Sequence, residues 1–340
     1  MTSRALVALL ATASLALLLG CGQHRGPAPG QLTLGMVTDV GGLGDRSFND
    51  SAYRGLVQSR KSLDAYIQVL QSRSAADYQP NLNALTNLHF EMIYAVGFLM
   101  GFDLDSVAKQ NPAQRYAIID AVVDDPNVVS ITFREQDGSF LAGALAAMVS
   151  RTHHIAFLGG QDIPLIQKFE AGYTAGAREI DPNVKVDVKY AGSFDDVAAG
   201  KELANLLFDD GADIIFTAAG KVGLGAIDAV KPRQNDYIIG VDSDQDALAP
   251  GKVLTSMVKK IDIAVYDVAH ALQQHHAMSG HVEFGLRDGA VGLTDFAYTK
   301  QAIGNTNLMR LKRIEAAIVA GRIDPPDSRA ALAKFTPVAL

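Results

Sequence analysis

The fold is decided by residues 32–49, which read LTLGMVTDVGGLGDRSFN. The apolar run at the start of this stretch predicts a β-strand over residues 32–37. Three glycines within residues 41–44 then allow the backbone to turn tightly and to approach a ligand closely. A helical pattern begins near Asn49, and either Ser47 or Asn49 can cap that helix. A strand, a glycine-rich loop and a helix start in this order are typical of a parallel α/β sheet.

The glycine-rich loop differs from the common phosphate-binding loops. Its Gly-Gly-x-Gly pattern lacks the G-x-G-x-x-G order of a dinucleotide site and the G-K-[ST] ending of a P-loop. Asp39 and Asp45 would also repel a phosphate. The free N–H groups at a helix start favour electron-rich ligand atoms, so we expect a neutral molecule that carries hydroxyl or amine groups. The alternative is an ordinary turn between strand and helix, in which glycine serves geometry alone.

The composition bounds the class of protein. The chain has 340 residues, 48% of them hydrophobic, so it can bury a large core and is expected to divide into two lobes. Its net charge of -7 argues against nucleic acid or an anionic membrane surface as the main partner. The single cysteine, Cys21, rules out a disulfide within the chain and a cysteine-based metal site.

The first 21 residues carry the features of a secretory signal. Arg4 supplies a positive charge, and residues 5–19 are almost wholly apolar but too few to span a membrane comfortably. The run ends in Leu-Leu-Gly-Cys and resembles a bacterial lipoprotein signal, whose Cys21 would become the lipidated first residue. Residues 22–31 then form a flexible tether. A plain signal peptide and an uncleaved anchor are the alternatives.

Short β-rich runs alternate with helical patterns through the rest of the chain. Two such series, each of about one hundred residues, predict two doubly wound parallel-sheet lobes. The strands are expected at residues 32–37, 65–70, 92–96, 116–119 and 127–133 in the first series and at 155–158, 184–190, 213–216 and 237–241 in the second.

The strands and helices predicted after residue 241 are too few for a third domain. We expect them to complete the first lobe and then the second, so that the chain crosses between lobes three times. These expectations assign residues 32–133 and 243–280 to lobe 1 and residues 134–242 and 281–300 to lobe 2. Residues 301–340, which include a predicted helix and a tail, are left without a lobe.

Aspartates follow three of the predicted strands. Open α/β sheets bind ligands outside the carboxyl ends of their strands, which is where Asp39, Asp120 and Asp242 stand. A single aspartate at such a place more often caps a helix or a turn. Three of them on two facing lobes predict a polar cleft instead, to which Phe194 and Gly220 also belong by their positions after strands.

Three other patterns that would indicate a metal site or a catalytic site are incomplete in this sequence. The aspartates within residues 242–246 mimic the start of an EF-hand loop, but Ala247 and Val253 stand where glycine and glutamate are needed. The histidines between residues 270 and 281 lack a regular metal-ligand spacing. No Ser-His-Asp order with a nucleophile elbow is visible. The sequence therefore predicts no metal, no cofactor and no covalent catalysis.

Seven short motifs follow one another along the chain. They are TDVGGLGDRSFN (38–49), AIID with PNV (117–128), GSFLAG (138–143), GSFDD (192–196), IIFTAAG (214–220), IGVDSDQ (239–245) and VLTSMVK (253–259). With these motifs the chain resembles the basic membrane protein family, which consists of lipoprotein purine-nucleoside receptors of ABC importers. The resemblance implies a type I periplasmic-binding fold, in which three strands hinge two α/β lobes.

The resemblance also implies roles for individual residues. Phe48 and Phe194 would stack on the two faces of a purine, and stacking on an aromatic ring contributes about 1 to 3 kcal/mol per base. Asp39 and Asp120 would accept hydrogen bonds from N–H groups of the base.

A second group of residues would hold the sugar. Asp242 with Lys259 would bind the ribose hydroxyls, because a carboxylate accepts two hydroxyl protons and an ammonium donates three hydrogen bonds. Ser47, Asn49 and Gly220 would line the same pocket.

The sequence thus predicts a monomeric, lipid-anchored receptor on the outer side of a membrane, with a purine nucleoside as ligand and an ABC permease as partner. A receptor for a sugar or another small solute on the same fold is one rival. An enzyme that hydrolyses nucleosides is the other, but it would need an aspartate-rich calcium cluster that the sequence lacks.

Overall fold

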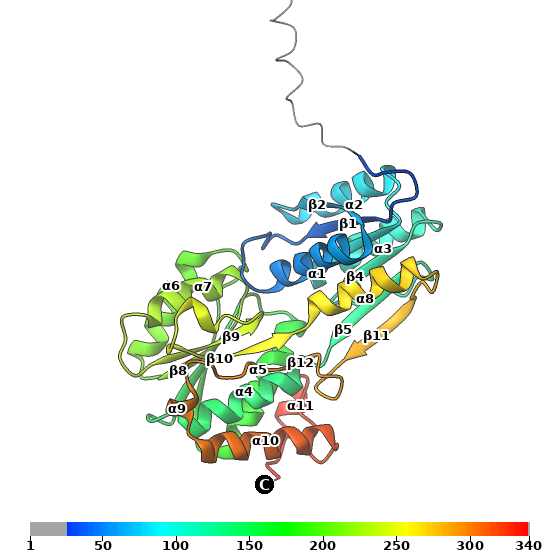
Figure 1. The fold of residues 1–340 in the computed structure, drawn as a ribbon. Helices are drawn as coiled ribbons and strands as arrows, with labels where there is room; N and C mark the ends of the chain where they lie inside the picture. Colours follow the sequence, from blue (N-terminus) through cyan, green and yellow to red (C-terminus); the bar gives the residue numbers. More distant parts are fainter. Residues whose placement is uncertain (1–25, 339–340) are drawn as a thin grey trace, which may run out of the picture. The chain divides into compact units, whose positions relative to one another are not determined.

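Two six-stranded sheets form the framework of the part of the chain that the structure describes, residues 26–338 (Figure 1). The structure is a computed structural model, and residues 32–340 make up one unit. The first sheet has the order β11-β5-β4-β3-β1-β2 and all of its strands run parallel. Its strands are β1 (Thr33–Thr38), β2 (Tyr66–Gln71), β3 (Met92–Val96), β4 (Tyr116–Ile119), β5 (Val128–Phe133) and β11 (Gly280–Phe284).

Helices cover both faces of this sheet, which explains why its central strands are nearly continuous apolar runs. One face packs against α1 and α8, which lie side by side, and the other packs against α2 and α3. The helices are α1 (Phe48–Leu63), α2 (Tyr78–Asn87), α3 (Gly101–Gln110) and α8 (Ile261–Gln273). A short 3-10 turn over Phe98–Met100 precedes α3.

The second sheet has the order β12-β10-β9-β8-β6-β7. Its strands are parallel except that β12 pairs antiparallel with β10. The strands are β6 (His154–Gly159), β7 (Lys185–Tyr190), β8 (Ile214–Ala218), β9 (Tyr237–Asp242), β10 (Val253–Lys259) and β12 (Val291–Leu293). Its helices are α4 (Glu135–Val149), α5 (Pro164–Ile180), α6 (Val197–Asp209), α7 (Lys221–Val230), α9 (Lys300–Ile303), α10 (Asn305–Val319) and α11 (Arg329–Leu332).

Glycines allow α4 and α5 to pack unusually close together. A Cβ atom added to Gly143 would lie 1.8 Å from the carbonyl oxygen of Tyr173, and one added to Gly176 would lie 1.9 Å from that of Phe140. No larger residue fits at either position. The close contact fixes the start of α5, which carries part of the site described below.

The expected doubly wound lobes and three crossings are confirmed, but two strands fall in lobes other than those expected. β10, expected in lobe 1, continues the second sheet beside β9, and β11, expected in lobe 2, pairs with β5 in the first sheet. Lobe 1 therefore comprises residues 32–133 and 261–284, and lobe 2 comprises residues 134–260 and 285–338. The sequence could not show this, because an apolar run does not identify the sheet edge on which it pairs. The C-terminal residues belong to lobe 2, since α10 packs on α4 and α11 on α5.

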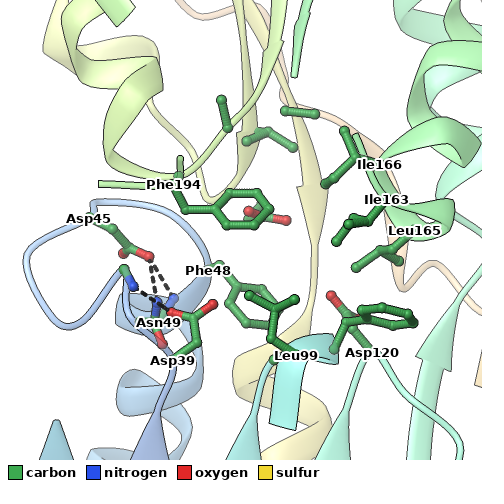
Figure 2. A pocket seen from close by; sticks show the side chains of 18 of the residues that line it. Asp39, Asp45, Phe48, Asn49, Leu99, Asp120, Ile163, Leu165, Ile166 and Phe194 are labelled. Carbon is green, nitrogen blue, oxygen red and sulfur yellow. Dashed lines mark hydrogen bonds between the residues drawn. The ribbon is translucent and has the colours of Figure 1, made fainter. Parts of the chain in front are cut away.

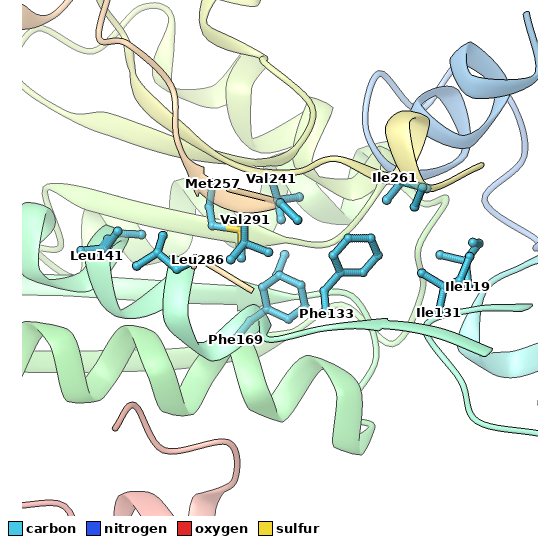
Figure 3. Close-up of a cluster of buried hydrophobic side chains, with 14 of the residues drawn as sticks. Ile119, Ile131, Phe133, Leu141, Phe169, Val241, Met257, Ile261, Leu286 and Val291 are labelled. Atoms are coloured by element: carbon cyan, nitrogen blue, oxygen red, sulfur yellow. The ribbon is translucent and has the colours of Figure 1, made fainter. Parts of the chain in front are cut away.

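The three crossings lie together and are hydrogen-bonded to one another. The backbone N–H of Arg134 donates to the carbonyl of Phe284 over 2.8 Å, and that of Lys260 donates to the carbonyl of Ala290 over 2.8 Å. The third crossing thus joins the other two. One apolar cluster also continues through this region from lobe 1 into lobe 2, with Phe133 at its centre in Figure 3.

The N-terminal signal features, including Cys21, lie outside the described residues. Within residues 26–338, no helix is long and apolar enough to cross a membrane. The same part of the chain holds no group of three histidine, cysteine or acidic side chains placed to bind a metal ion.

Candidate functional site

A cavity lies between the lobes, where the carboxyl ends of the two sheets face each other. Its volume is about 60 Å³ counted as the space open to the centres of water molecules, and about 590 Å³ counted as all atom-free space, part of it open to solvent. The cavity is therefore small. The sequence-predicted residues that line it are Asp39, Phe48, Asn49, Asp120, Phe194, Gly220, Asp242 and Lys259.

Ser47 is the one predicted site residue that does not line the cavity. Its side chain is fully buried, and its hydroxyl lies 2.8 Å from Oδ2 of Asp242 and 3.1 Å from the carbonyl oxygen of Val241. In return, the hydroxyl of Ser243 donates to the carbonyl of Ser47 over 2.7 Å. Ser47 stands behind the wall of the cavity and joins lobe 1 to the Asp242 end of lobe 2.

The two predicted aromatic rings lie on opposite sides of the cavity. Figure 2 shows Phe194 above it and Phe48 below it. Phe48 is the first residue of α1, and Phe194 lies in the loop after β7. Glycines position this loop: a Cβ atom on Gly160 would lie 2.3 Å from the Phe194 ring, and one on Gly220 would lie 2.9 Å from its carbonyl oxygen. Both glycines therefore keep Phe194 in place over the cavity.

Asp39 is held by the loop that the sequence singled out. Its Oδ1 accepts hydrogen bonds from the backbone N–H of Gly41 (2.9 Å) and from Nδ2 of Asn49 (2.8 Å). Asp45 orients Asn49 in turn, since its Oδ2 accepts from the Asn49 backbone N–H over 2.8 Å. Burial raises the pKa of Asp39 to about 6. Within the described residues, Oδ1 of Asn49 has no hydrogen-bond partner although it is buried at the cavity, which leaves an acceptor for a ligand.

Lys259 is the centre of a buried group of charges. Only 2% of the residue is exposed, and its Nζ lies 2.6 Å from Oδ2 of Asp120 and 3.1 Å from Oε1 of Glu135. Burial opposes its charge, but the neighbouring carboxylates raise the pKa of Lys259 above its ordinary value. The ring of Phe48 lies 5.4 Å from Nζ, within the range of a cation–π contact.

Asp120 and Asp242 share an uncommon backbone conformation at their strand ends. Their φ angles are 69° and 63°, in the left-handed region that residues with a Cβ rarely adopt. Burial raises the pKa of Asp120 to about 7, although Lys259 opposes that shift, and raises the pKa of Asp242 to about 6. Within the described residues, Oδ1 of Asp120 also has no hydrogen-bond partner. Strained backbone and unpaired buried carboxylate oxygen are both typical of binding sites.

The sequence did not identify two parts of the site. Glu135 begins α4, and an acidic residue in the first turn of a helix is expected on local grounds alone. The other part is an apolar wall, defined here as Ile163, Leu165, Ile166 and Phe169 at the start of α5. Figure 2 shows the first three of these side chains at the right of the cavity. These side chains match an ordinary helix core pattern, so no signal in the sequence separates them from packing residues.

The chain is similar to several known proteins. The chain is 37% identical to the CD4+ T-cell-stimulating antigen of Listeria monocytogenes over 87% of this chain and 88% of that protein. It is 34% identical to the ABC transporter nucleoside-binding protein BmpA of Lactococcus lactis, over 84% and 90% of the two chains. It is also 36% identical to basic membrane protein A of Borreliella afzelii, over 81% and 86%.

Solved structures place the fold among solute-binding proteins. A solute-binding protein of an ABC transporter system from Aeropyrum pernix has a TM-score of 0.82 and 26% identity, and the match covers 89% of this chain and 96% of that one. The expected type I periplasmic-binding fold is therefore confirmed. Residues 32–327 match the family described as ABC transporter substrate-binding protein, PnrA-like, and the resemblance to basic membrane proteins is confirmed with it. The chain belongs to this family of PnrA-like proteins, which are the substrate-binding components of ABC transporters and not enzymes.

Proposed function

We propose that this binding protein captures a purine nucleoside in the cavity between its lobes and delivers it to an ABC permease. The observation that carries the proposal is the pair of phenyl rings on opposite sides of the cavity, whose lining also includes three aspartates. A pair of opposed aromatic rings suits a flat, bicyclic base. The carboxylates suit a ligand that brings many hydrogen-bond donors.

The base is assigned to the end of the cavity that lobe 1 forms. Asp39 and Asp120 are buried acceptors at the ends of β1 and β4, and the unpaired Oδ1 atoms of Asn49 and Asp120 add further acceptors. Purine N–H and amino groups can satisfy these atoms. An unpaired buried acceptor costs about 1 to 3 kcal/mol, so a ligand that satisfies it is favoured over one that does not.

The ribose is assigned to Asp242 and Lys259. Ser47 holds one carboxylate oxygen of Asp242, and the other oxygen remains to accept from sugar hydroxyls. Lys259 already donates to Asp120 and Glu135, so one of its three protons remains for the ligand. Lys259 therefore serves mainly as the counter-ion of the site and only secondarily as a donor to the sugar.

Nucleotides are expected to bind poorly. Asp39, Asp120 and Asp242 all face the cavity, and the positive charge of Lys259 is already shared with two carboxylates. A phosphate in this space would be repelled. The cavity is therefore expected to bind an uncharged nucleoside more tightly than the corresponding nucleotide.

We also infer that Cys21 carries a lipid that attaches the protein to the outer face of a membrane. The support is the signal-like sequence of residues 1–21 and the tether after it. In this position the cavity would collect nucleosides outside the cell and present them to the permease.

A thermal-shift panel with calorimetry tests the ligand class. Guanosine, inosine and adenosine should stabilise the protein most, by about 2.7 kcal/mol at one hundred times the dissociation constant, which is a shift of several degrees. Pyrimidine nucleosides and free bases should stabilise less, and ribose and nucleotides least.

The matched variants are Phe48→Ala, at the cavity, and Phe102→Ala, whose side chain is on the surface of α3 and 84% exposed. The Phe48 variant should lose nucleoside affinity, whereas the Phe102 variant should bind like the wild type. If ribose gave the largest shift and Phe48→Ala left it unchanged, the sugar-receptor alternative would replace the nucleoside assignment. Release of free base during the incubation would instead indicate a hydrolase.

A further inference from the structure

The short helix α11 packs on α5, which carries the apolar wall, although α11 lies outside the family match. That match ends at residue 327, and α11 begins at Arg329. Ser328 caps this helix, because its hydroxyl accepts from the backbone N–H of Ala331. The tail beyond it is also fixed to lobe 2: the Phe335 ring lies 5.8 Å from that of Phe140, and the backbone N–H of Val338 donates to Glu179.

Arg329 joins three side chains of lobe 2. Its Nε and one terminal nitrogen donate to the carboxylate of Glu170, at 3.0 Å and 2.7 Å, which is the paired geometry that a guanidinium forms best. Its other terminal nitrogen donates to Asp162 over 3.2 Å. The hydroxyl of Tyr190 lies 3.2 Å from the guanidinium and itself donates to Glu170.

Each of these three partners adjoins the apolar wall of the cavity. Asp162 directly precedes Ile163, and Glu170 directly follows Phe169. The ring of Tyr190 lies against Gly159, where a Cβ atom would approach it to 2.5 Å and would lie 3.0 Å from Ile166. Arg329 is therefore bonded to the residues at both ends of the wall segment and to Tyr190, whose ring lies behind the wall.

The geometry sets this group apart from an ordinary surface ion pair. Exposed pairs contribute little, but Glu170 is only 7% exposed and would be left as a buried, unpaired charge without Arg329. A lysine could not replace the arginine, since it lacks the planar fork that reaches Glu170 and Asp162 together.

We propose that Arg329 is a positioning residue that holds the apolar wall at the start of α5 in its ligand-binding arrangement. The inference rests on the proposed function, because it concerns affinity at the same cavity. Arg329 does not line the cavity and acts through Asp162, Glu170 and Tyr190.

Calorimetric titration of inosine into Arg329→Met tests the effect on affinity. We expect the dissociation constant to rise by about threefold to thirtyfold, the range found for residues that act on a site without touching its ligand. Arg329→Lys should bind no better than Arg329→Met. Asp162→Asn removes only the ion pair between Arg329 and Asp162. Because Asp162 is half exposed, this variant should fold stably and should lose less inosine affinity than Arg329→Met. Arg322→Met, at an exposed arginine of the same C-terminal region, is the matched control and should bind like the wild type.

Double-mutant cycles separate positioning from a general loss of stability. The losses caused by Arg329→Met and Ile166→Ala should not add, because both act on the wall, whereas those of Arg329→Met and Asp39→Asn should add. Equal additivity in the two cycles would show that Arg329 is merely structural and would overturn the proposal.

Hydrogen exchange without ligand tests the positioning independently of the ligand's identity. In Arg329→Met, the amides of residue 163 and residues 165–169 should exchange faster than in the wild type, including that of Gln167, which donates to the carbonyl of Ile163. Unchanged exchange would overturn the proposal. If exchange rose while the wild type bound no nucleoside, the nucleoside assignment would fail and the positioning role would stand.

Discussion

Lowering the pH from about 7.5 to about 5 should weaken nucleoside binding and stabilise the ligand-free protein at the same time. Both effects have one origin, because burial raises the pKa values of Asp39 and Asp242 to about 6 and that of Asp120 to about 7. In the unfolded chain these groups keep their ordinary pKa of about 3.8. Between these limits the folded state holds protons that the unfolded state releases.

The sign for stability follows from that difference. Folding takes up protons between about pH 4 and pH 7, so the free energy of unfolding is highest at the acidic end of this window. It falls as the pH rises through the pKa values of the folded state. Most buried carboxylates in ion pairs show the opposite trend, so this direction indicates that desolvated acids dominate the pH dependence of stability.

The sign for binding is opposite, because an ionised carboxylate is needed to accept two hydrogen bonds from a ligand. One pH unit below a pKa of about 6, about one tenth of Asp39 or Asp242 is ionised, and apparent affinity scales with the competent fraction. Each residue therefore contributes about a tenfold loss at about pH 5, and the two together about a hundredfold loss. Asp120 is not counted in this hundredfold loss, because Lys259 binds its carboxylate and its protonation therefore depends on Lys259 as well.

Calorimetry across this pH range measures the affinity, and urea unfolding of the ligand-free protein measures the stability. Asp39→Asn should bind more weakly at neutral pH and should lose about one factor of ten from the pH dependence. Asp228→Asn, at a half-exposed surface carboxylate paired with Lys231, should keep the full dependence. An affinity that stays constant down to about pH 5, or a stability that rises with pH through the same window, would refute the reasoning.

Three further outcomes are expected. Lys259→Met should lower the free energy of unfolding at neutral pH by about 3 to 5 kcal/mol, since Asp120 loses its counter-ion and Glu135 keeps only its 3.5 Å contact with Lys168. Lys260→Met at the exposed neighbour should cost little in the same urea titration. Cys21→Ser should abolish lipid labelling and release the mature chain into soluble fractions, and continued membrane attachment would contradict the lipoprotein prediction. Saturating inosine should reduce the radius of gyration in X-ray scattering by closing the hinge, whereas equal radii with and without ligand would exclude ligand-dependent closure.

The architecture was largely predictable because its parallel strands are buried on both faces and leave long apolar runs between helical patterns. Local chemistry also located the start of α1, since the helical pattern predicted near Asn49 begins at Phe48 in the structure. The lobe membership of β10 and β11 was not predictable. The sequences of β10 and β11 do not identify their partner strands, because pairing with β9 or β5 is decided by which sheet edge is free, and this depends on the folded chain as a whole.

The site residues were predictable where backbone geometry demands unusual residues. Glycines and aspartates at strand ends stand out from an apolar background, and Asp39, Asp120 and Asp242 do line the cavity. Glu135 and the apolar wall were not predictable, because their side chains are also what an ordinary helix start and helix core contain. The position of the wall at the cavity and that of Glu135 beside Lys259 are products of tertiary packing.

The charged residues at the cavity adjoin the residues of the hinge. We therefore expect ligand contacts with these charges to affect how the two lobes are connected. Lys259 ends β10 directly before the second crossing, and Glu135 starts α4 directly after the first. Their ion pair joins these two crossings, and the bond from Lys259 to Asp120 ties them to lobe 1. A ligand donor at the unpaired Oδ1 of Asp120 would share this carboxylate with Lys259, which holds Oδ2, so we expect binding to change the bonds that connect the crossings. We therefore expect the free energy of ligand binding and that of lobe closure to depend on the same few hydrogen bonds.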